Sequence, residues 1–409
     1  MDAGSNVGSG VEEPEALRAA MVEELQDLGS VRSESVERAF RAVPRHLFSP
    51  EASPMETYGV NRSVTVKRRE DGTALSTLSA ASLQADMLEQ AEVAPGMRVL
   101  EIGSGGANAA LLAELVGPSG QVVTVDIDPE VTGLAQRGLA EAGYEQQVTV
   151  VCSDAEHGVP HGPFDQVLVT FGAWDIPPTW VDQLAPEGRL IVPLRLGGVT
   201  RSLALERDEA RLVSRSAHPC GFVLSQGEGG HDEHVVLVDA DVGLRFDDEP
   251  GELDVDGLRA AMAGERVERW SGITIGEADQ IDGMTLWLVT QLPRFGMLTA
   301  RQAAVDRGLV GRPARRGVPA LIRGGSFAYR GAIRPTSEGD RFEFGVYGHG
   351  EHGDALAEEY IALMRQWDQQ HRHGHGAVIE VYPAGVPDAQ LPAGLVLDKP
   401  HTRVVIFWR

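Results

Sequence analysis

The sequence predicts an α/β fold, in which a doubly wound, Rossmann-like sheet is followed by a C-terminal α+β domain. Residues 99–128 give, in order, an apolar strand, a glycine-rich turn, an apolar-periodic helix, a second strand and an acid. Strand-like and helix-like segments continue to alternate as far as residue 193, which is typical of a parallel sheet with helices on both faces. From residue 200 the strands become shorter, and this change indicates a different architecture.

The segments that precede the sheet have patterns of their own. Residues 1–14 are polar and acidic, so we expect a disordered lead-in there. The helix expected at 33–42 has a serine cap at Ser33 and is stopped by Pro44. The strand expected at 62–67 is followed by the charged, hairpin-like RREDGT. These elements are helices at 15–28, 33–42 and 80–90 and a strand at 62–67.

The remaining elements follow from the same alternation. In the first domain we expect a helix at 129–142, a strand at 148–152, a strand at 166–170, a helix at 178–184, and strands at 188–193, 202–207 and 220–225. The second domain should contain strands at 285–292, 327–333, 342–347, 378–382 and 403–408 and a helix at 354–371. We place the first domain at 15–235 and the second at 240–409.

Composition excludes several classes of protein. A formal net charge of −24 argues against a nucleic-acid partner, which would require a concentrated basic face. Two cysteines exclude a disulfide framework and fit a reducing cytoplasm. No signal peptide and no membrane-spanning apolar run is visible, so we expect a cytoplasmic protein that does not engage a membrane.

Two clusters of charged side chains need interpretation. Residues 307–335 carry seven arginines and no acid, including Arg315 and Arg316. This run is either a solvated face or a surface that binds anions, for which carboxylates are suitable partners. The histidines at 371–375 lie in a glycine-rich turn without a cysteine partner, so we expect no metal site.

The glycine turn predicts a nucleoside site. Gly103 and Gly105 allow close approach of a ligand to the backbone, and the following helix offers free N–H groups. Asp126, at the end of the second strand, is placed to bind both ribose hydroxyls. A dinucleotide fingerprint would need a small residue where Asn108 stands, and it would not need the acid Glu101 before the turn.

Four segments in the same order resemble the protein L-isoaspartate O-methyltransferase family. VLEIGSG resembles motif I of S-adenosylmethionine methyltransferases, in which the turn binds the amino-acid end of the cofactor. The other segments are SVERAFRAVPRHLFSPEA (35–52), TLSA (77–80) and FDQVLVTFGAWDIPPTWVDQLAPEGRLIVPL (164–194). The resemblance covers about residues 15–225.

The resemblance implies a set of site residues. Ser79 would fix the substrate carboxylate, and its alternative role is that of an N-cap for the next helix. Asp154 would accept from the adenine amino group, or cap a second helix. The implied cofactor-binding residues are Glu101, Gly103, Ser104, Gly105, Asp126, Ile127, Asp154, Ala155 and Thr170. The implied substrate-binding residues are Thr77, Ser79 and Phe171, to which the arginine run adds Arg315 and Arg316.

Departures from the family pattern refine the expected function. A longer segment between Tyr58 and Ser79, which includes residues 67–72, and a C-terminal extension of well over one hundred residues resemble members that modify ribosomally made peptides of the lanthipeptide or graspetide type. We therefore expect esterification of an aspartate or isoaspartate in a precursor peptide, already cyclised and acidic, leading to aspartimide or isoaspartate. General repair of isoaspartyl proteins and an inactive peptide-binding scaffold are the alternatives, and a monomer is favoured.

Overall fold

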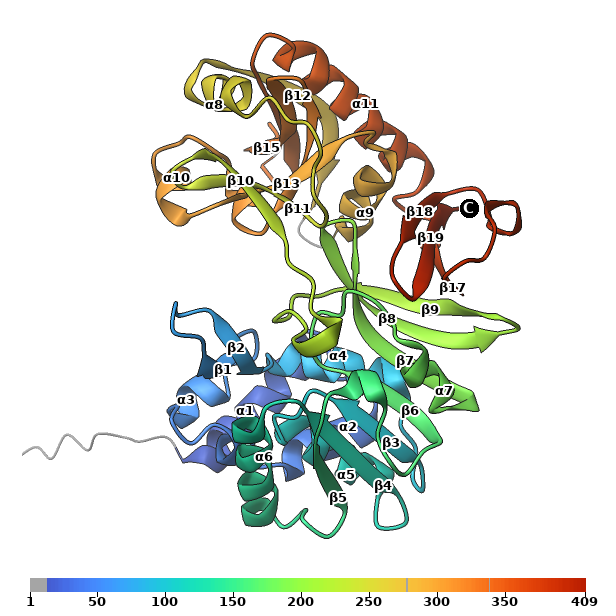
Figure 1. The fold of residues 1–409 in the computed structure, drawn as a ribbon. Helices are drawn as coiled ribbons and strands as arrows, with labels where there is room; N and C mark the ends of the chain where they lie inside the picture. Colours follow the sequence, from blue (N-terminus) through green and yellow to red (C-terminus); the bar gives the residue numbers. More distant parts are fainter. Residues whose placement is uncertain (1–12, 277–278, 338) are drawn as a thin grey trace, which may run out of the picture. The chain divides into compact units, whose positions relative to one another are not determined.

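The computed structural model describes residues 13–276, 279–337 and 339–409. Contacts divide the chain into two compact units (Figure 1). The first unit contains the described residues up to Leu194 together with Thr200–His231. The second contains Arg195–Val199 and Asp232–Arg409, so the chain enters the second unit briefly before it completes the first. The expected disordered lead-in lies almost entirely outside the described residues.

The sheet of the first unit has the strand order β9-β8-β7-β6-β3-β4-β5. Its parallel strands are β3 (Arg98–Ile102), β4 (Gln121–Asp126), β5 (Val148–Cys152), β6 (Phe164–Val169) and β7 (Leu184–Leu196). The strands β8 (Val199–Asp208) and β9 (Arg211–Pro219) form an antiparallel pair. Because the strand order reverses at β3, a crevice is expected at the carboxyl ends of β3, β4 and β6. The predicted doubly wound sheet is confirmed.

Helices cover this sheet, and local sequence explains where they begin. Ser33 accepts a hydrogen bond from the Val36 amide (3.3 Å) at the start of α2, as predicted. Asp128 does the same for α6 through the Glu130 amide (2.9 Å). The helices of this unit are α1 (Pro14–Asp27), α2 (Glu34–Ala42), α3 (Pro54–Thr57), α4 (Ala81–Ala91), α5 (Ala107–Val116), α6 (Pro129–Ala142) and α7 (Pro178–Asp182), with short 3-10 turns η1 (Arg45–Phe48), η2 (Ala155–His157) and η3 (Gly227–Gly229).

A separate two-stranded hairpin precedes α4. Its strands, β1 (Val64–Arg68) and β2 (Ala74–Leu78), pair antiparallel around the predicted charged turn. We call residues 64–78 the hairpin. It brings the end of β2 next to the glycine turn, because residues of both line the same cavity.

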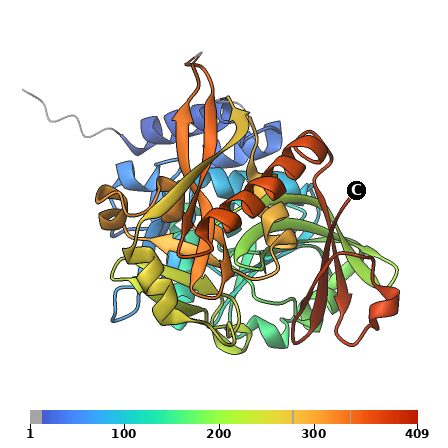
Figure 2. The same cartoon turned by 90° about the horizontal axis from the view of Figure 1, so that it is seen from above.

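The second unit is built on an antiparallel sheet of order β10-β11-β13-β14-β15-β16-β12. These strands are β10 (His234–Asp239), β11 (Val242–Phe246), β12 (Arg266–Ile275), β13 (Phe295–Ala300), β14 (Val318–Arg323), β15 (Ser326–Pro335) and β16 (Phe342–His349). The long helix α11 (Gly353–Gln370) packs against β12, β15 and β16 of this sheet and crosses the strands obliquely in Figure 2. The other elements are α8 (Val255–Ala263), α9 (Asp282–Gln291), α10 (Gln302–Asp306), η4 (Arg312–Arg315), η5 (Asp388–Gln390) and the strands β17 (Ala377–Pro383), β18 (Leu395–Asp398) and β19 (Thr402–Trp408).

Segment 195–199 is anchored in the second unit by a buried arginine. The Arg195 guanidinium donates to Glu233 (2.8 Å) and Asp247 (2.5 Å), and its own carbonyl accepts from Lys399 (2.6 Å). The amide of Gly198 donates to the other oxygen of Asp247 (2.6 Å). These contacts explain why the tip between β7 and β8 belongs with residues that follow it by 38 to 204 positions in the chain.

Two predicted strands are wrong. Residues 285–292 form part of α9 rather than a strand, because Met284, Trp287 and Leu288 recur at helical spacing and pack into the core around α11. Residues 220–225 are irregular, apart from a single bridge between Leu224 and Gly172. The strand in this part of the chain is β9, which ends at Pro219. The other predicted elements of the first domain, and the four later strands and the helix of the second, are confirmed within a few residues at each end.

Within the described part of the chain, no helix combines the length and apolar character needed to span a bilayer. Among the same residues, no three His, Cys, Asp or Glu side chains are grouped so that they could hold a metal ion.

Candidate active site

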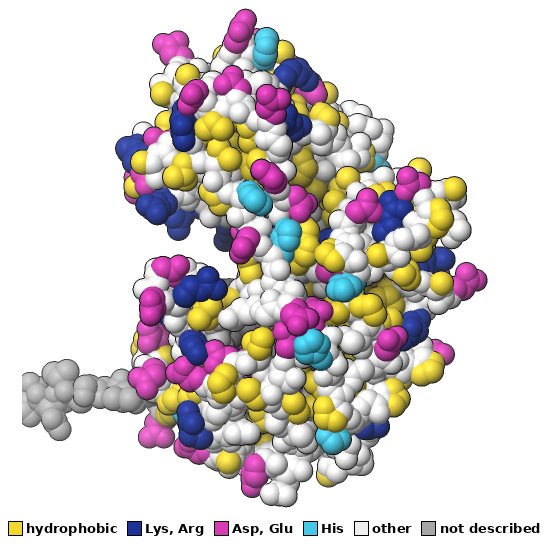
Figure 3. Space-filling view, viewed as in Figure 1, with side chains coloured by type: hydrophobic (Ala, Val, Ile, Leu, Met, Phe, Trp, Pro, Cys, Tyr) yellow, Lys and Arg dark blue, Asp and Glu magenta, His cyan; other side chains and the backbone are white. Residues whose placement is uncertain are grey.

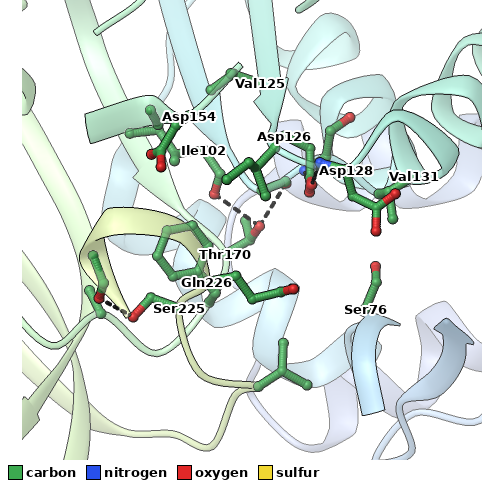
Figure 4. A pocket seen from close by; sticks show the side chains of 18 of the residues that line it. Ser76, Ile102, Val125, Asp126, Asp128, Val131, Asp154, Thr170, Ser225 and Gln226 are labelled. Atoms are coloured by element: carbon green, nitrogen blue, oxygen red, sulfur yellow. Dashed lines mark hydrogen bonds between the residues drawn. The ribbon is translucent and has the colours of Figure 1, made fainter. Parts of the chain in front are cut away.

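A cavity of about 90 Å³ lies at the carboxyl ends of β3, β4 and β6, where the strand order reverses (Figure 4). Its wall comes from four places: the glycine turn, the ends of the neighbouring strands, the end of the hairpin, and residues 223–229, which we call the strap. A second cavity of about 30 Å³ adjoins it. Thr77, Gly103, Gly105 and Thr170 line both.

The glycine turn has a conformation that its sequence requires. Gly103 has φ +101°, and a Cβ there would lie 2.4 Å from the Thr170 hydroxyl oxygen. That hydroxyl donates to the Gly103 carbonyl (2.8 Å), one of the dashed contacts in Figure 4. A Cβ built on Gly105 would meet nothing within 4 Å, so this residue borders open space. The turn therefore exposes its backbone to the cavity while Thr170 fixes its position.

Asp126 is held rigidly at the end of β4. One carboxylate oxygen accepts from the Ser104 amide (3.0 Å), and the other accepts from the Asp128 amide (2.9 Å). Burial raises the pKa of this carboxyl above its usual range, while the backbone hydrogen bonds act in the opposite direction. Asp126 faces the cavity in Figure 4, as expected of a residue that binds ribose hydroxyls.

Glu101 has a less satisfied environment. The residue is 0% exposed, and one oxygen accepts from the Thr124 hydroxyl (2.5 Å). The other, Oε1, has no hydrogen-bond partner among the described residues. Burial raises the pKa of Glu101 to about 7. Because Glu101 lines the smaller cavity, Oε1 is an acceptor suited to a cationic group there.

Asp154 and the strap close the opposite side of the cavity. Asp154 accepts from the Glu156 amide (3.0 Å) as the N-cap of η2, so its predicted capping role is confirmed. Its other oxygen accepts from the Glu228 amide of the strap (3.1 Å). Gly227 has φ +72° and packs so closely that a Cβ would lie 2.4 Å from Asp154 and 2.7 Å from Ile127. The predicted contact of Asp154 with adenine remains a prediction.

The hairpin reaches the cavity from another direction. Its residues Leu75 and Ser76 line the wall, and the Leu75 carbonyl accepts from the side-chain Nε2 of Gln226 in the strap (3.2 Å). Lys67 lies 2.7 Å from the Asp128 carboxylate and 2.8 Å from that of Glu130. These contacts connect the hairpin both to the strap and to the first turn of α6.

Ser79 occupies a different position from the one that its capping role required. The N-cap of α4 is Ala80, which makes no side-chain cap bond, so the predicted serine cap is wrong. Ser79 lies one residue too early and borders the smaller cavity instead. Its carbonyl accepts from Arg45, a contact that no local sequence pattern indicates.

The other expected site residues are split between the units. Ser104, Ile127, Ala155, Thr170 and Phe171 all line the main cavity. Phe171 also meets the Trp180 ring edge-on, with centroids 6.1 Å apart. Sequence reasoning missed Trp174, Trp180 and the strap, although the glycine-rich QGEGG (226–230) is a sequence feature that indicates a tight loop.

Arg315 and Arg316 lie in the second unit, at η4, and both are exposed. The surrounding run has no acid in sequence but has acids in space. Arg307 pairs with Asp239 and Asp241, Arg323 with Glu359, and Arg334 with Glu343. Within the described residues, Arg315 and Arg316 have no such ion pair. Figure 3 shows basic side chains near α10 of this unit with acidic ones among them.

Comparison with known proteins gives a consistent family. A model of the family described as protein-L-isoaspartate(D-aspartate) O-methyltransferase matches residues 16–228. A protein-L-isoaspartate O-methyltransferase from Methanopyrus kandleri is 37% identical over 219 residues, 53% of this chain and 94% of that protein. One from Thermotoga maritima is 38% identical over 203 residues, 49% of this chain and 63% of that protein. A solved structure titled protein-L-isoaspartate O-methyltransferase aligns with 89% of this chain and 96% of its own, at 22% identity and a TM-score of 0.48.

Proposed function

Because the chain belongs to the protein-L-isoaspartate(D-aspartate) O-methyltransferase family, an enzyme family that uses S-adenosylmethionine, we propose that it methylates the free carboxylate of isoaspartyl residues in polypeptides. The family match covers almost the whole candidate site, and this observation carries the proposal. Residues 16–228 include every residue that lines the two cavities except Gly229.

The residues present fit the cofactor. The unpartnered Oε1 of buried Glu101 suits an ammonium group, and the open face at Gly105 leaves room for the amino-acid end. Asp126, already oriented by two backbone amides, would bind the ribose hydroxyls. Ile127 and the strap would enclose the adenine beside Asp154.

The reaction needs alignment more than acid–base catalysis. When bound, S-adenosylmethionine supplies an electrophilic methyl group. A carboxylate is ionised at neutral pH, so the attacking oxygen needs no general base. Thr77, which lines both cavities, and Ser79, which lines the smaller one, would fix the acceptor carboxylate, and the hairpin and strap would limit access of water. In the resulting ester, attack by the next backbone nitrogen expels methanol and gives an aspartimide.

The proposal is tested with two peptides that differ only in one residue, isoaspartyl or aspartyl. With methyl-labelled S-adenosylmethionine, we expect base-labile label in the isoaspartyl peptide at a much higher kcat/KM. A third peptide with asparagine at that position is the control. Equal labelling of the first two would contradict selectivity for isoaspartyl residues, and no labelling of either would favour the inactive scaffold.

The second unit supports another candidate: modification of one dedicated biosynthetic peptide. Residues 232–409 lie outside the family match, and the Methanopyrus protein is matched over 94% of its length. However, more than a third of the Thermotoga protein also lies outside its match, so additional sequence occurs in relatives that carry the same name. General repair is therefore the better supported reading. Dedicated modification depends on the second unit recognising the peptide.

A further inference from the structure

Arg45 is a buried cation without a carboxylate partner. The residue is 3% exposed and follows the Val-Pro pair at the start of η1. Its guanidinium donates to the Thr57 carbonyl (2.9 Å), the Gln84 side-chain oxygen and the Ser79 carbonyl. All three acceptors are neutral, and no ion pair of Arg45 is found within the described residues. A buried charge in such surroundings is costly unless a negative group lies nearby.

The contact with Arg45 fixes the orientation of the Gln84 side chain. A guanidinium can only donate hydrogen bonds, so the Gln84 amide must present its oxygen to Arg45. The donating Nε2 group is then directed elsewhere, and it makes no hydrogen bond to any described residue. Gln84 is 7% exposed and lines the smaller cavity together with Ser79 and Glu101. The cavity thus combines an oriented amide donor with the acceptor oxygen of Glu101.

We propose that Gln84 and Arg45 form a carboxylate-recognising pair, in which Gln84 Nε2 donates to a ligand carboxylate in the smaller cavity and Arg45 orients Gln84 and the Ser79 peptide. Arg45 acts through these two groups, so it is a positioning residue. The inference rests on the proposed function. The carboxylate that Gln84 binds is either that of the acceptor isoaspartyl residue or that of the amino-acid end of S-adenosylmethionine.

Helix α4 itself supplies a matched control. Gln90 lies in the same helix, is 5% exposed, and donates to the Ser202 carbonyl (3.1 Å) and the Ser216 hydroxyl (2.8 Å). It lines neither cavity. Gln84→Leu and Gln90→Leu therefore remove the same side-chain amide from similar burial, once beside the cavities and once away from them.

The experiment measures ligand affinity by calorimetry and kinetics with an isoaspartyl peptide, in the full chain. The two ligands are S-adenosylhomocysteine and 5′-methylthioadenosine, which lacks the amino-acid carboxylate. If the carboxylate is that of the cofactor, Gln84→Leu should weaken the binding of S-adenosylhomocysteine about 10-fold or more. The affinity for methylthioadenosine should then stay unchanged. If it is that of the acceptor, both affinities should persist and KM should rise about 10-fold. Gln84→Glu, which places a negative charge beside the ligand, should have a larger effect in the same direction.

Arg45→Lys keeps the charge but cannot contact three acceptors in the same geometry. We expect it to show part of the Gln84→Leu defect, with normal methylthioadenosine binding as a sign that the fold is intact. Unchanged S-adenosylhomocysteine affinity and KM in a folded Gln84→Leu chain would overturn the inference. Equal losses in Gln90→Leu would also overturn it, because the amide would then be only structural. If the wild type fails to methylate the peptide, the proposed function fails, while the calorimetric comparison still decides the role of the pair.

Discussion

Glu101 and Asp126 lie at the ends of neighbouring parallel strands, yet their carboxylates differ in how well they are hydrogen-bonded. Both oxygens of Asp126 accept backbone N–H bonds, whereas Glu101 keeps one oxygen without a partner in a fully buried place. The first arrangement gives a preformed anion at the cavity wall. The second stores an unfavourable charge that a cationic group could relieve.

At Asp126, we expect Asp126→Ala to abolish measurable binding of S-adenosylhomocysteine while the chain remains folded. Loss of two hydrogen bonds to a charged acceptor should cost roughly 3–6 kcal/mol. Calorimetry checks this, with Asp126→Asn as a milder variant that keeps one acceptor oxygen. Near-normal affinity in Asp126→Ala would remove the ribose assignment.

Glu101 predicts a pH dependence of stability. Burial raises its pKa from 4.5 to about 7. Between these values the folded chain holds a proton that the unfolded chain has lost, so the free energy of unfolding falls as the pH rises. Above the upper value the cost is on the order of 3 kcal/mol. Glu101→Gln should therefore be more stable than the wild type in urea at about pH 8, with no gain at about pH 4, and should bind cofactor more weakly. A gain of equal size at both pH values would show that the cause is not the ionisation of Glu101.

Ser79→Ala tests the acceptor side of the site. Loss of one positioned hydrogen bond should lower the single-turnover rate of methyl transfer about 10- to 1000-fold. Cofactor affinity should change little, because the Ser79 hydroxyl is expected to contact the acceptor carboxylate rather than the cofactor. An unchanged rate would show that only the backbone of Ser79, through its contact with Arg45, matters.

Sequence reasoning at this scale succeeds where chemistry is local. Gly103 and Asp126 could be assigned because a turn between strand and helix restricts which residues fit. Gln84 and Arg45 could not, since they are 39 residues apart and meet only through packing of α4 against the N-terminal segment. Trp174 was missed for a related reason: its stacking on His231, with ring centroids 3.7 Å apart, joins the loop after β6 to a residue just beyond the strap.

At the scale of elements, two irregular pieces complete the cavity that the regular sheet only begins. The hairpin and the strap lie far apart in the sequence and are linked by the hydrogen bond between Gln226 and Leu75, which are 151 residues apart. Lys67 connects the hairpin to α6, with its side chain 26% exposed and that of Asp128 15% exposed. This position at the cavity wall predicts that the hairpin controls how long a nucleoside remains bound.

Lys67→Ala should increase the rate at which S-adenosylhomocysteine dissociates, with little change in its association. Because solvent screens a partly exposed ion pair, the effect should be small, about a 2- to 5-fold faster release. Stopped-flow displacement measures it, and high salt should reduce the difference. Arg68→Ala is the control, because the hydrogen bonds of Arg68 to described residues stay within the same hairpin, to Gly72 and Thr65. Equal acceleration in both variants would mean that the hairpin is loosened in general rather than released from α6.

The elements were predictable where one pattern dominated. The helix α6 and the strand β5 have the predicted bounds, since periodicity, caps and turn residues agree there. In α9, β-branched and aromatic residues favour a strand locally, but packing against α11 decides for a helix. Strands β10 to β14 escaped prediction; a glycine interrupts the apolar pattern of β11, β12 and β13, and Pro319 interrupts that of β14.

At the scale of the whole molecule, the strongly acidic chain has an exposed pair of arginines at η4. Arg315→Glu together with Arg316→Glu should raise KM for an acidic isoaspartyl peptide about 3- to 10-fold at low salt, and less at high salt. S-adenosylhomocysteine affinity should not change. The control is Arg38→Glu with Arg62→Glu, the same change of charge at exposed positions of the first unit. Similar effects in both would mean that net charge alone matters, and general repair would then need no recognition by the second unit.

Residues 195–199 belong to the second unit but precede the last part of the first, and this order has a consequence for folding during synthesis on the ribosome. Arg195 leaves the ribosome before the carboxylates of Glu233 and Asp247, which neutralise it. At about 5–20 residues per second, this interval lasts about 2–10 s. During that time the β7–β8 tip must stay hydrated while residues 200–231 complete the neighbouring sheet. Translation begins the second unit before it has finished the first, so the folding of the two units is interleaved in time.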